Sequence, residues 1–352
     1  IISIEELGKL ELNIEGICDM DIATQHIDTG FNSIRHKAEV FPEIETIECE
    51  LHNALSDSQG AIRQMCSHMA GSGGKRIRPL LVLYCGLVFS KPSGNLKKAA
   101  VAAELIHMAT LAHDDIIDDS QIRRGKPTLN TVWGNHSSVL CGDYLFAKAF
   151  GILSENKLYK SLALMVEAID NMCNGEIQQA ENRFNINMNL EIYYEQITRK
   201  TAKFLECCCK SGASVGNADE LQTAAIGKYG LNLGLAFQII DDILDYRGSE
   251  DIMGKPKGED LRQGIITLPL ILLQSSEKYG TVANDIIYKK LICERDYAIL
   301  GDLLFNTGSI EQSHKIALSH IDKALLCLKA LPDSPYRDAL SNLAEMLRFR
   351  DN

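Results

Sequence analysis

The sequence predicts an all-α protein built as a single domain. Three observations support this: the 352 residues contain only eight prolines, none of them between Pro127 and Pro256; aromatic residues make up 6% of the chain; and Ala, Leu and Ile recur at helical spacing. No stretch has the composition of a linker, so one domain is expected although the length would allow two.

Composition and charge exclude several classes of function. The formal net charge of -11 argues against a general nucleic-acid or anionic-membrane surface, because both need clustered positive charge. No apolar run reaches the ~20 residues that span a bilayer, so no transmembrane segment is predicted. The eleven cysteines form no CxxC pair and no zinc-like Cys/His spacing, which indicates buried thiols in a reducing compartment. We therefore expect a cytoplasmic protein.

The chain begins with a segment of unassigned role. Residues 1–35 mix short apolar pairs with acids and have poor periodicity, so we treat them as an N-terminal extension and place the helical domain over residues 36–352. Within residues 41–70, apolar positions recur at three and four, which predicts two helices separated near residues 56–60. A further apolar helix is expected over residues 80–90.

A glycine-rich basic loop precedes that third helix. It reads Gly-Ser-Gly-Gly-Lys-Arg-Ile-Arg-Pro over residues 71–79. Glycines expose backbone N–H groups and allow an anion to approach closely, while Lys75, Arg76 and Arg78 supply positive charge in an acidic protein. The alternative is a flexible, solvated basic loop in which Pro79 opens the next helix. The GxxxxGK(S/T) spacing of a P-loop is absent.

The helix predicted over residues 95–119 ends in four aspartates. Asp118 lies about 40° from Asp114 on the helical wheel and His107 about 20° on the other side, so the three share one face. Carboxylates at a helix C-terminus oppose the macrodipole and repel one another, at a local cost of ~1 kcal/mol or more. Two interpretations are open: a solvated acidic end with the two arginines that follow as counter-ions, or carboxylates clamping a divalent metal that bridges to phosphate.

The same acidic pattern recurs once. Residues 237–246 read Phe-Gln-Ile-Ile-Asp-Asp-Ile-Leu-Asp-Tyr, again at the C-terminal end of an apolar helix. Two clusters, each ending a helix that would be more stable without them, favour the metal-binding interpretation. Gly227, Gly230 and Gly234 project within about 40° of Asp241, although each costs ~0.8 to 1 kcal/mol against alanine. Either close helix packing or a channel beside the acids explains them.

The remaining sequence is predicted to complete a helical bundle. Helices are expected over residues 136–155, 158–185, 190–211 and 218–246, with further helices over residues 265–350. Lys200 and Thr201 fall in mid-helix, where a lysine is usually a snorkelling surface residue. The polar loop over residues 253–264 carries three basic residues, Lys255 among them. It is either a plain surface loop or a lid that closes over an anionic substrate.

In order and spacing, a set of short motifs resembles those of the trans-isoprenyl diphosphate synthases. They are Gly-Gly-Lys-Arg-Ile-Arg-Pro (73–79), Glu-Leu-Ile-His (104–107), His-Asp-Asp-Ile-Ile-Asp-Asp (113–119), Arg-Arg-Gly-Lys-Pro-Thr (123–128), Gly-Asp-Tyr-Leu (142–145), Lys-Thr (200–201), Phe-Gln-Ile-Ile-Asp-Asp-Ile-Leu-Asp (237–245) and Gly-Lys-Pro-Lys-Gly-Glu-Asp-Leu (254–261). The resemblance covers roughly residues 40–350, and the motifs are jointly highly specific.

The resemblance implies an isoprenoid-synthase-type antiparallel helical bundle around a central deep cavity. It also implies head-to-tail (1'-4) condensation of isopentenyl diphosphate with an allylic diphosphate, whose C–O bond ionises to an allylic cation that the alkene attacks before a proton is lost. About three Mg²⁺ ions would hold the allylic diphosphate, with the ligands Asp114, Asp115, Asp118, Asp241, Asp242 and Asp245. By the same resemblance, the rest of the allylic site would be Arg123, Lys200, Thr201, Gln238 and Lys255. Isopentenyl diphosphate would be held by Lys75, Arg78, His107 and Arg124. The residues expected to carry catalysis are Asp114, Asp241, Lys200 and Thr201.

Two positions bear on specificity. Many members of the family carry a lysine after the glycine matched by Gly264, whereas this chain has Ile265, which removes one expected contact to the allylic diphosphate. In short-chain members, bulky aromatics stand four and five residues before the first acidic motif, where this chain has Thr110 and Ala109. An open channel there predicts a product of about C30 to C50, of the kind used for quinone side chains.

Four alternatives define what has to be tested. The chain could be a short-chain (geranylgeranyl or farnesyl) diphosphate synthase, or a class I terpene cyclase, although Asp-Asp-Ile-Leu-Asp at 241–245 and the basic loop count against a cyclase. It could also be a non-catalytic subunit, which would typically lose one acidic motif, or the catalytic half of a heteromeric synthase that needs a small partner. From the resemblance we expect a homodimer.

Overall fold

The computed structural model describes residues 43–247, 258–290 and 292–348. The chain divides into two compact units, residues 1–45 and 46–352, and the description below concerns the second. The predicted N-terminal extension and Lys255 lie outside the described residues, so both stay predictions.

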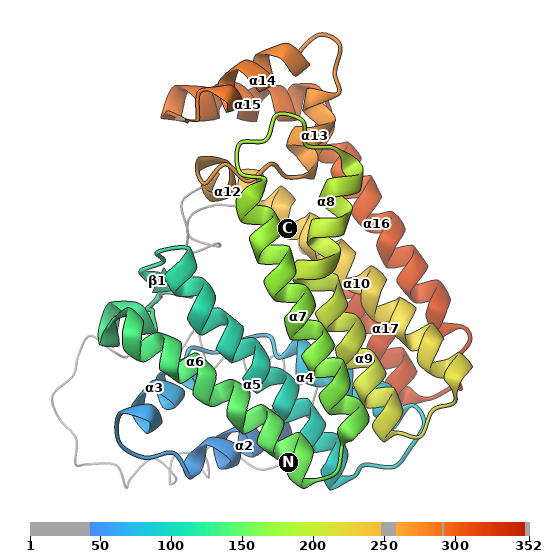
Figure 1. The fold of residues 1–352 in the computed structure, drawn as a ribbon. Helices are drawn as coiled ribbons and strands as arrows, with labels where there is room; N and C mark the ends of the chain where they lie inside the picture. Colours follow the sequence, from blue (N-terminus) through green and yellow to red (C-terminus); the bar gives the residue numbers. More distant parts are fainter. Residues whose placement is uncertain (1–42, 248–257, 291, 349–352) are drawn as a thin grey trace, which may run out of the picture. The chain divides into compact units, whose positions relative to one another are not determined.

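The described residues confirm the all-α prediction, since apart from one short hairpin the regular structure is helical (Figure 1). The elements in chain order are α2 (Glu43–Ser56), α3 (Gly60–Gly71), α4 (Ile77–Leu87), α5 (Gly94–Ile117), β1 (Ile122–Arg123), β2 (Lys126–Pro127), α6 (Leu129–Glu155), α7 (Tyr159–Glu181), α8 (Leu190–Ile197), the π-helical turn η2 (Thr198–Ala202), α9 (Lys203–Val215), α10 (Glu220–Arg247), α12 (Glu259–Arg262), α13 (Leu268–Gln274), α14 (Gly280–Tyr288), α15 (Glu294–Asn306), α16 (Ser309–Leu328) and α17 (Pro335–Arg348). None of the helices within these ranges is both long and apolar enough to span a bilayer.

Caps and glycines explain several helix boundaries. The Ser93 hydroxyl accepts the Leu96 N–H at 3.2 Å and so begins α5. The predicted break between the first two helices is confirmed, because α2 and α3 are separate. The helix predicted over residues 136–155 begins earlier, at Leu129. It runs through a kink at Gly134, whose φ of 78° is readily adopted only by glycine.

The core of the bundle is formed where α9 packs against α4, α5 and α10 and α4 packs against α5, with α6 along α5 and α16 along α10 (Figure 1). α4 is buried from Pro79 to Leu87, as expected for a helical segment that is apolar on every side. The buried face of α5 is rich in alanine, for example Ala99, Ala102 and Ala109. Such small side chains let neighbouring helices approach closely.

The three glycines of α10 serve close packing. A Cβ on Gly234 would stand 2.5 Å from Ala202 Cα, and one on Gly230 would stand 2.7 Å from the Leu205 carbonyl oxygen. The close-packing interpretation is therefore correct, and the channel interpretation of these glycines is wrong. Because Gly234 lets α10 lie directly against η2, the next turn of α10 reaches the side chains that η2 presents.

The single helix predicted over residues 190–211 is divided into α8, η2 and α9. Lys200 and Thr201 lie in the π-helical turn between them. A π-turn inserts an extra residue into the helix and changes the direction of the side chains that follow; such turns occur often at functional sites. Lys200 is thus not placed as it would be on the surface of a regular helix.

Candidate active site

The two acidic helix ends meet at η2. We call Asp114, Asp115 and Asp118 the first acidic cluster, and Asp241, Asp242 and Asp245 the second. Burial lowers the pKa of Lys200, but the carboxylates of Glu176, Asp114 and Asp118 raise it overall, so the first cluster lies within electrostatic range of Lys200. On the next residue, the Thr201 hydroxyl donates to Gln238 Oε1 at 2.7 Å, and Gln238 Nε2 donates to Asp242 Oδ1 at 3.0 Å. Two segments more than 100 residues apart therefore converge on one turn of backbone.

Arg78 provides independent evidence for this convergence. The carboxylates of both Asp114 and Asp241 act on its guanidinium, although burial, the larger effect, lowers the pKa of Arg78 overall. Its guanidinium lies 5.2 Å from the centre of the Phe204 ring on α9. Arg78 thus stands within electrostatic range of both clusters.

The six aspartates differ in exposure. Asp114, Asp118 and Asp241 are partly exposed, whereas the other three members of the clusters are buried. The exposed three come from both clusters. They are the carboxylates best placed to reach a ligand between α5 and α10.

The buried aspartates have structural partners. Asp242 accepts the Tyr193 hydroxyl at 2.6 Å as well as the Gln238 amide, so each of its oxygens has a hydrogen bond. Asp115 accepts the Arg123 Nε–H at 2.6 Å. The Asp245 Oδ1 accepts the Glu259 backbone N–H at 3.2 Å, but its buried Oδ2 has no hydrogen-bond partner among the described residues.

The hairpin β1–β2 places the two arginines that follow α5. Ile122 pairs with Pro127 and Arg123 with Lys126, and the two residues between the strands, Arg124 and Gly125, have φ of 53° and 74°. Positive φ at both positions is what a two-residue hairpin turn requires. Arg123 consequently reaches back to Asp115, while the Arg124 guanidinium donates to the Gly73 carbonyl.

The three charged residues of the basic loop lie in different environments. Arg76, in a left-handed backbone conformation (φ 49°) just before α4, is buried and donates to Glu104 at 2.6 Å and to Glu48 at 2.7 Å. Burial alone lowers the pKa of Arg76, but the two carboxylates raise it overall. Lys75 is exposed and Arg78 partly exposed. Arg76 therefore anchors the loop, whereas Lys75 and Arg78 keep part of their surface exposed.

Arg76→Met is expected to destabilise the fold. The substitution leaves the buried Glu104 carboxylate, whose side chain is 4% exposed, without its partner, which typically costs about 3 to 5 kcal/mol. The exposed Arg63 on α3 gives a matched control, because the same substitution there should change the free energy of unfolding by less than about 0.5 kcal/mol. Urea unfolding followed by circular dichroism measures both; equal midpoints for the two variants would contradict the anchoring role.

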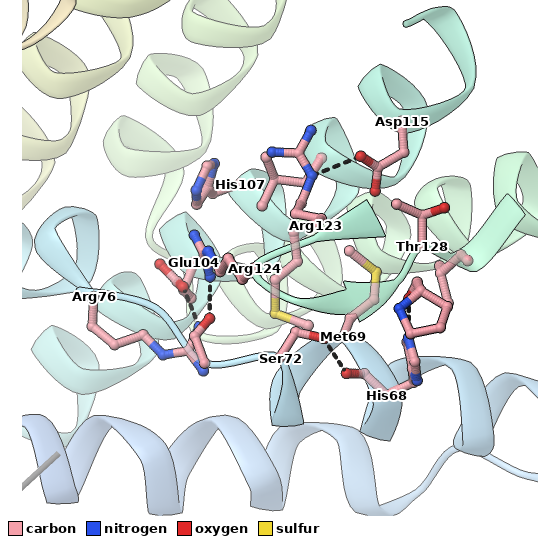
Figure 2. Close-up of a pocket in the computed structure, with 15 residues that line it drawn as sticks. His68, Met69, Ser72, Arg76, Glu104, His107, Asp115, Arg123, Arg124 and Thr128 are labelled. Atoms are coloured by element: carbon pink, nitrogen blue, oxygen red, sulfur yellow. Dashed lines mark hydrogen bonds and ion pairs between the residues drawn. The ribbon is translucent and has the colours of Figure 1, made fainter. Parts of the chain in front are cut away.

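A small pocket of about 40 Å³ lies between α3, the basic loop, α5 and the hairpin. His107, Arg123 and Arg124 line it, together with Arg76 and Asp115 (Figure 2). It thus brings together two of the four residues predicted to hold isopentenyl diphosphate. Lys75 and Arg78 do not line this pocket.

The surroundings of this pocket are cationic. Burial, followed by the positive charges of Arg78, Arg124 and Arg123, lowers the pKa of His107 well below its usual range, so its imidazole is neutral at pH 7. Arg123 is paired with Asp115. Among the described carboxylates, none lies within ion-pair distance of Arg78 or Arg124. The positive charges of these two guanidinium groups are therefore not neutralised by a described carboxylate, which suits them to an anionic ligand.

The residue types of the clusters fit hard divalent cations, which prefer oxygen ligands. Burial and the nearby Glu176 carboxylate raise the pKa of Asp114 to about 7, and burial and Asp260 raise that of Asp245 to about 7. Negative charge is therefore crowded here, and within the described ranges the buried Asp245 Oδ2 lacks a hydrogen-bond partner; a cation would relieve both. No three His, Cys, Asp or Glu side chains of the described ranges enclose a metal site by themselves, so a ligand would have to supply further oxygens.

The two positions predicted to control chain length differ in environment. Ala109 is fully buried, with no exposed surface. Thr110 is partly exposed, lies one turn before Asp114 on the same side of α5, and donates its hydroxyl to the His107 carbonyl at 2.9 Å. Of the two, only Thr110 borders open space.

Ile265 follows a tightly packed glycine. Gly264 has a φ of 81° and lies against the Phe184 ring, which a Cβ on Gly264 would approach to 2.4 Å, and its carbonyl accepts the Phe184 N–H at 2.7 Å. The Ile265 N–H donates to the Asp260 carbonyl at 2.8 Å. The Ile265 side chain is apolar and offers no charge to a diphosphate.

Sequence reasoning missed several residues that hold the site together. Lys200 Nζ contacts Glu176 at 2.7 Å and Gln179 at 2.7 Å, and Tyr193 holds Asp242. Tyr193 lies on the buried face of α8 at 1% exposure. Glu176 and Gln179, in contrast, are partly exposed polar residues of α7 that look like ordinary solvated surface in the sequence. Only the π-turn reveals that Lys200 points toward them.

Together, the fold and the site define a class: an all-α protein in which two acidic helix ends lie near one lysine-bearing π-turn and offer oxygen ligands of the kind that hard cations prefer, beside arginines that have no carboxylate partner among the described residues. The comparisons with known proteins agree. The polyprenyl synthetase family model matches residues 59–299.

Individual relatives cover nearly the whole length of the chain. Component 2 of heptaprenyl diphosphate synthase from Geobacillus stearothermophilus is 35% identical over 309 residues, which cover 88% of this chain and 96% of the relative. A short chain isoprenyl diphosphate synthase from Methanothermobacter thermautotrophicus is 33% identical over 318 residues, with 88% and 96% covered. The crystal structure of a polyprenyl synthase from Caulobacter crescentus, complexed with calcium and isoprenyl diphosphate, matches with a TM-score of 0.83 at 33% identity and covers 90% of this chain and 98% of that one.

The chain belongs to the polyprenyl synthetase family. The prediction of a trans-prenyltransferase with an isoprenoid-synthase fold is therefore confirmed. Similar relatives make both medium and short chains, as their names state.

Proposed function

We propose that this enzyme condenses isopentenyl diphosphate head-to-tail with an allylic diphosphate bound between α5 and α10, and that its product is a medium or long all-trans polyprenyl diphosphate. The observation that carries the proposal is the convergence of the two acidic clusters on η2, where Lys200 lies within electrostatic range of the first cluster and Thr201 is linked through Gln238 to the second. Carboxylates bind a diphosphate only through cations, so a metal-bridged substrate accounts for both clusters at once.

The allylic diphosphate would be held by side chains that surround η2. Asp114, Asp118 and Asp241 are the partly exposed carboxylates that would bind Mg²⁺, about three ions in all. The metal ions would neutralise the charge that develops on the departing diphosphate. The chain's own cations, Lys200 and Arg123, would act on the same charge, and Lys255 would be added from the predicted lid.

The buried members of the clusters would act by orientation. Asp242 fixes the Gln238 amide, which in turn accepts the Thr201 hydroxyl. This chain of hydrogen bonds holds Thr201 and Gln238 toward the diphosphate. Asp115 holds Arg123 in the same way. The calcium in the Caulobacter crescentus complex supports a divalent cation in this family's sites.

Isopentenyl diphosphate would lie nearer the basic loop. Arg78 and Arg124, which lack carboxylate partners within the described ranges, would bind its diphosphate together with Lys75. The neutral His107 would donate a hydrogen bond rather than a charge. The two sites differ in how they would bind a diphosphate, one through metal ions and the other directly through arginines. This difference assigns the allylic substrate to the metal-bridged site, because only the allylic diphosphate needs to ionise.

Assembly is part of the proposal. The outer side of α6 exposes the apolar side chains Val132, Val139 and Leu140, at 49, 42 and 50%, and such a surface supports contact with a second subunit, which we propose is a second copy of this chain. The relative named component 2 supports a second candidate, a two-component enzyme in which this chain is the catalytic half.

Incubating the purified chain with Mg²⁺, farnesyl diphosphate and isopentenyl diphosphate tests the proposal, with chromatography of the dephosphorylated products. Turnover by the chain alone, abolished by EDTA and restored by Mg²⁺, is the expected result. Silence alone but turnover after addition of a small partner component supports the two-component enzyme. A cyclic hydrocarbon, or no product under either condition, would overturn the proposed reaction.

A further inference from the structure

We propose that Glu176 and Gln179, on α7, are positioning residues that hold the Lys200 ammonium beside the first acidic cluster and thereby set the affinity for the allylic diphosphate. The inference rests on the proposed function, because Lys200 is one of the cationic groups of the proposed allylic diphosphate site. It concerns two residues that no sequence motif discussed above includes.

The contacts are direct. Lys200 Nζ lies 2.7 Å from Glu176 Oε1 and donates to Gln179 Oε1 at 2.7 Å. The two acceptors stand three residues apart and therefore share one face of α7. The Lys200 and Glu176 side chains are 30 and 25% exposed, so the ammonium is held at the boundary between protein and solvent.

Gly175 makes this arrangement possible. A Cβ at Gly175 would stand 2.8 Å from the Lys200 backbone nitrogen and 3.1 Å from Lys200 Cα. Any larger residue would therefore push α7 away from η2. With glycine, the two backbones touch, and Glu176 is presented within reach of the Lys200 side chain.

The surrounding charges explain why the contacts of Lys200 with Glu176 and Gln179 matter. Burial by itself lowers the pKa of Lys200, and the carboxylates of Glu176, Asp114 and Asp118 outweigh it, so the pKa is raised. Lys200 thus stands between Glu176 and the first acidic cluster. A free lysine samples many rotamers, and two acceptors on a rigid helix remove most of that freedom before substrate arrives. The ammonium is then already aimed at the space that the diphosphate would enter.

Glu176→Gln keeps the size and one acceptor but removes the charge. We expect about tenfold weaker binding of an allylic thiolodiphosphate, in which sulfur replaces the bridging oxygen so that the bond does not ionise, because a charge-assisted hydrogen bond is lost. Binding of isopentenyl diphosphate should change less than about twofold, since neither Glu176 nor Gln179 lines the pocket that contains His107 and Arg124. Titration calorimetry of the full chain with Mg²⁺ measures both.

Glu195→Gln is the matched control. Glu195, an exposed residue of α8, pairs at 2.6 Å with Arg199 of η2. Its substitution should leave both affinities unchanged. The decisive comparison is the double variant Glu176→Gln/Lys200→Ala: if Glu176 acts through Lys200, its substitution has little further effect once the lysine is gone. An undiminished tenfold loss in that background, or weaker Mg²⁺ binding at unchanged analogue affinity, would overturn the positioning role.

A second measurement does not depend on substrate. Acylation of lysines by acetic anhydride, read by mass spectrometry, should modify Lys200 several-fold faster in Glu176→Gln than in the wild type, because the ammonium is released. Lys203 on α9 serves as the internal reference. An unchanged rate of Lys200 acylation in Glu176→Gln would contradict the proposal that Glu176 holds the ammonium. A faster rate in a protein whose wild type does not bind the analogue would instead support a Lys200 ammonium held by Glu176 and overturn the proposed function.

Discussion

Asp241→Asn is expected to lower kcat/KM for the allylic diphosphate by about a thousandfold, and Asp114→Asn by a similar factor, because each removes charged oxygens from the site that stabilises the departing diphosphate. The two residues come from different helices, α5 and α10. Both are partly exposed and both act on Arg78. The rate is measured at saturating Mg²⁺ with radiolabelled isopentenyl diphosphate.

Asp119→Asn provides the control for these variants. Asp119 is exposed, lies five residues from Asp114, and has a φ of 50°, a conformation that asparagine also tolerates. Its substitution should leave activity within about twofold of the wild type, since it removes no charge from either cluster. If Asp119→Asn is as damaging as Asp114→Asn, the effect reflects the helix end in general and the assignment of Asp114 as a metal ligand is wrong.

Thr110→Phe should shorten the product. A ring at this partly exposed position, one turn before Asp114, would block the path of the growing chain and move the main product to about C20 or below, because a close-packed interior leaves no route past it. Chromatography of the dephosphorylated alcohols shows the distribution. A wild-type product that is already C15 or C20 would contradict the predicted chain length before any variant is made.

Ala109→Phe tests whether position 109 contributes to core packing or borders the path of the growing chain. Ala109 is fully buried, so a phenylalanine there should destabilise the protein by about 1 to 3 kcal/mol through overpacking. Thr110→Ser, which keeps the hydroxyl that bonds to the His107 carbonyl, should leave the product distribution unchanged. An unaltered product from Thr110→Phe, with normal activity, would show that the chain passes elsewhere.

The fold class followed from simple features of the sequence. Scarce proline and helical spacing of apolar residues predict helices, and helices such as α2, α3 and α5 are found close to their predicted limits. The recurrence of Asp-Asp-x-x-Asp at two helix ends pointed to the pair of segments that the fold brings together. These are local patterns, which a single sequence records directly.

What could not be predicted depends on tertiary contacts. The π-turn that redirects Lys200 has no sequence signal, and the partners Glu176 and Gln179 are identified only when α7 and η2 are side by side. The sequence treated the six aspartates as equivalent, whereas packing gives Asp115 and Asp242 internal hydrogen-bond partners. Likewise Arg76 looked like its neighbours in the basic loop until its buried carboxylates were seen.

The most direct test of the account is calorimetric titration of an allylic thiolodiphosphate into the full chain, with and without Mg²⁺, for the wild type, Asp114→Asn and Asp241→Asn. Binding that requires Mg²⁺ and is weakened at least about tenfold by either substitution is the predicted result. Binding that persists in EDTA, or that survives the loss of either carboxylate unchanged, would contradict a shared metal-bridged site between α5 and α10.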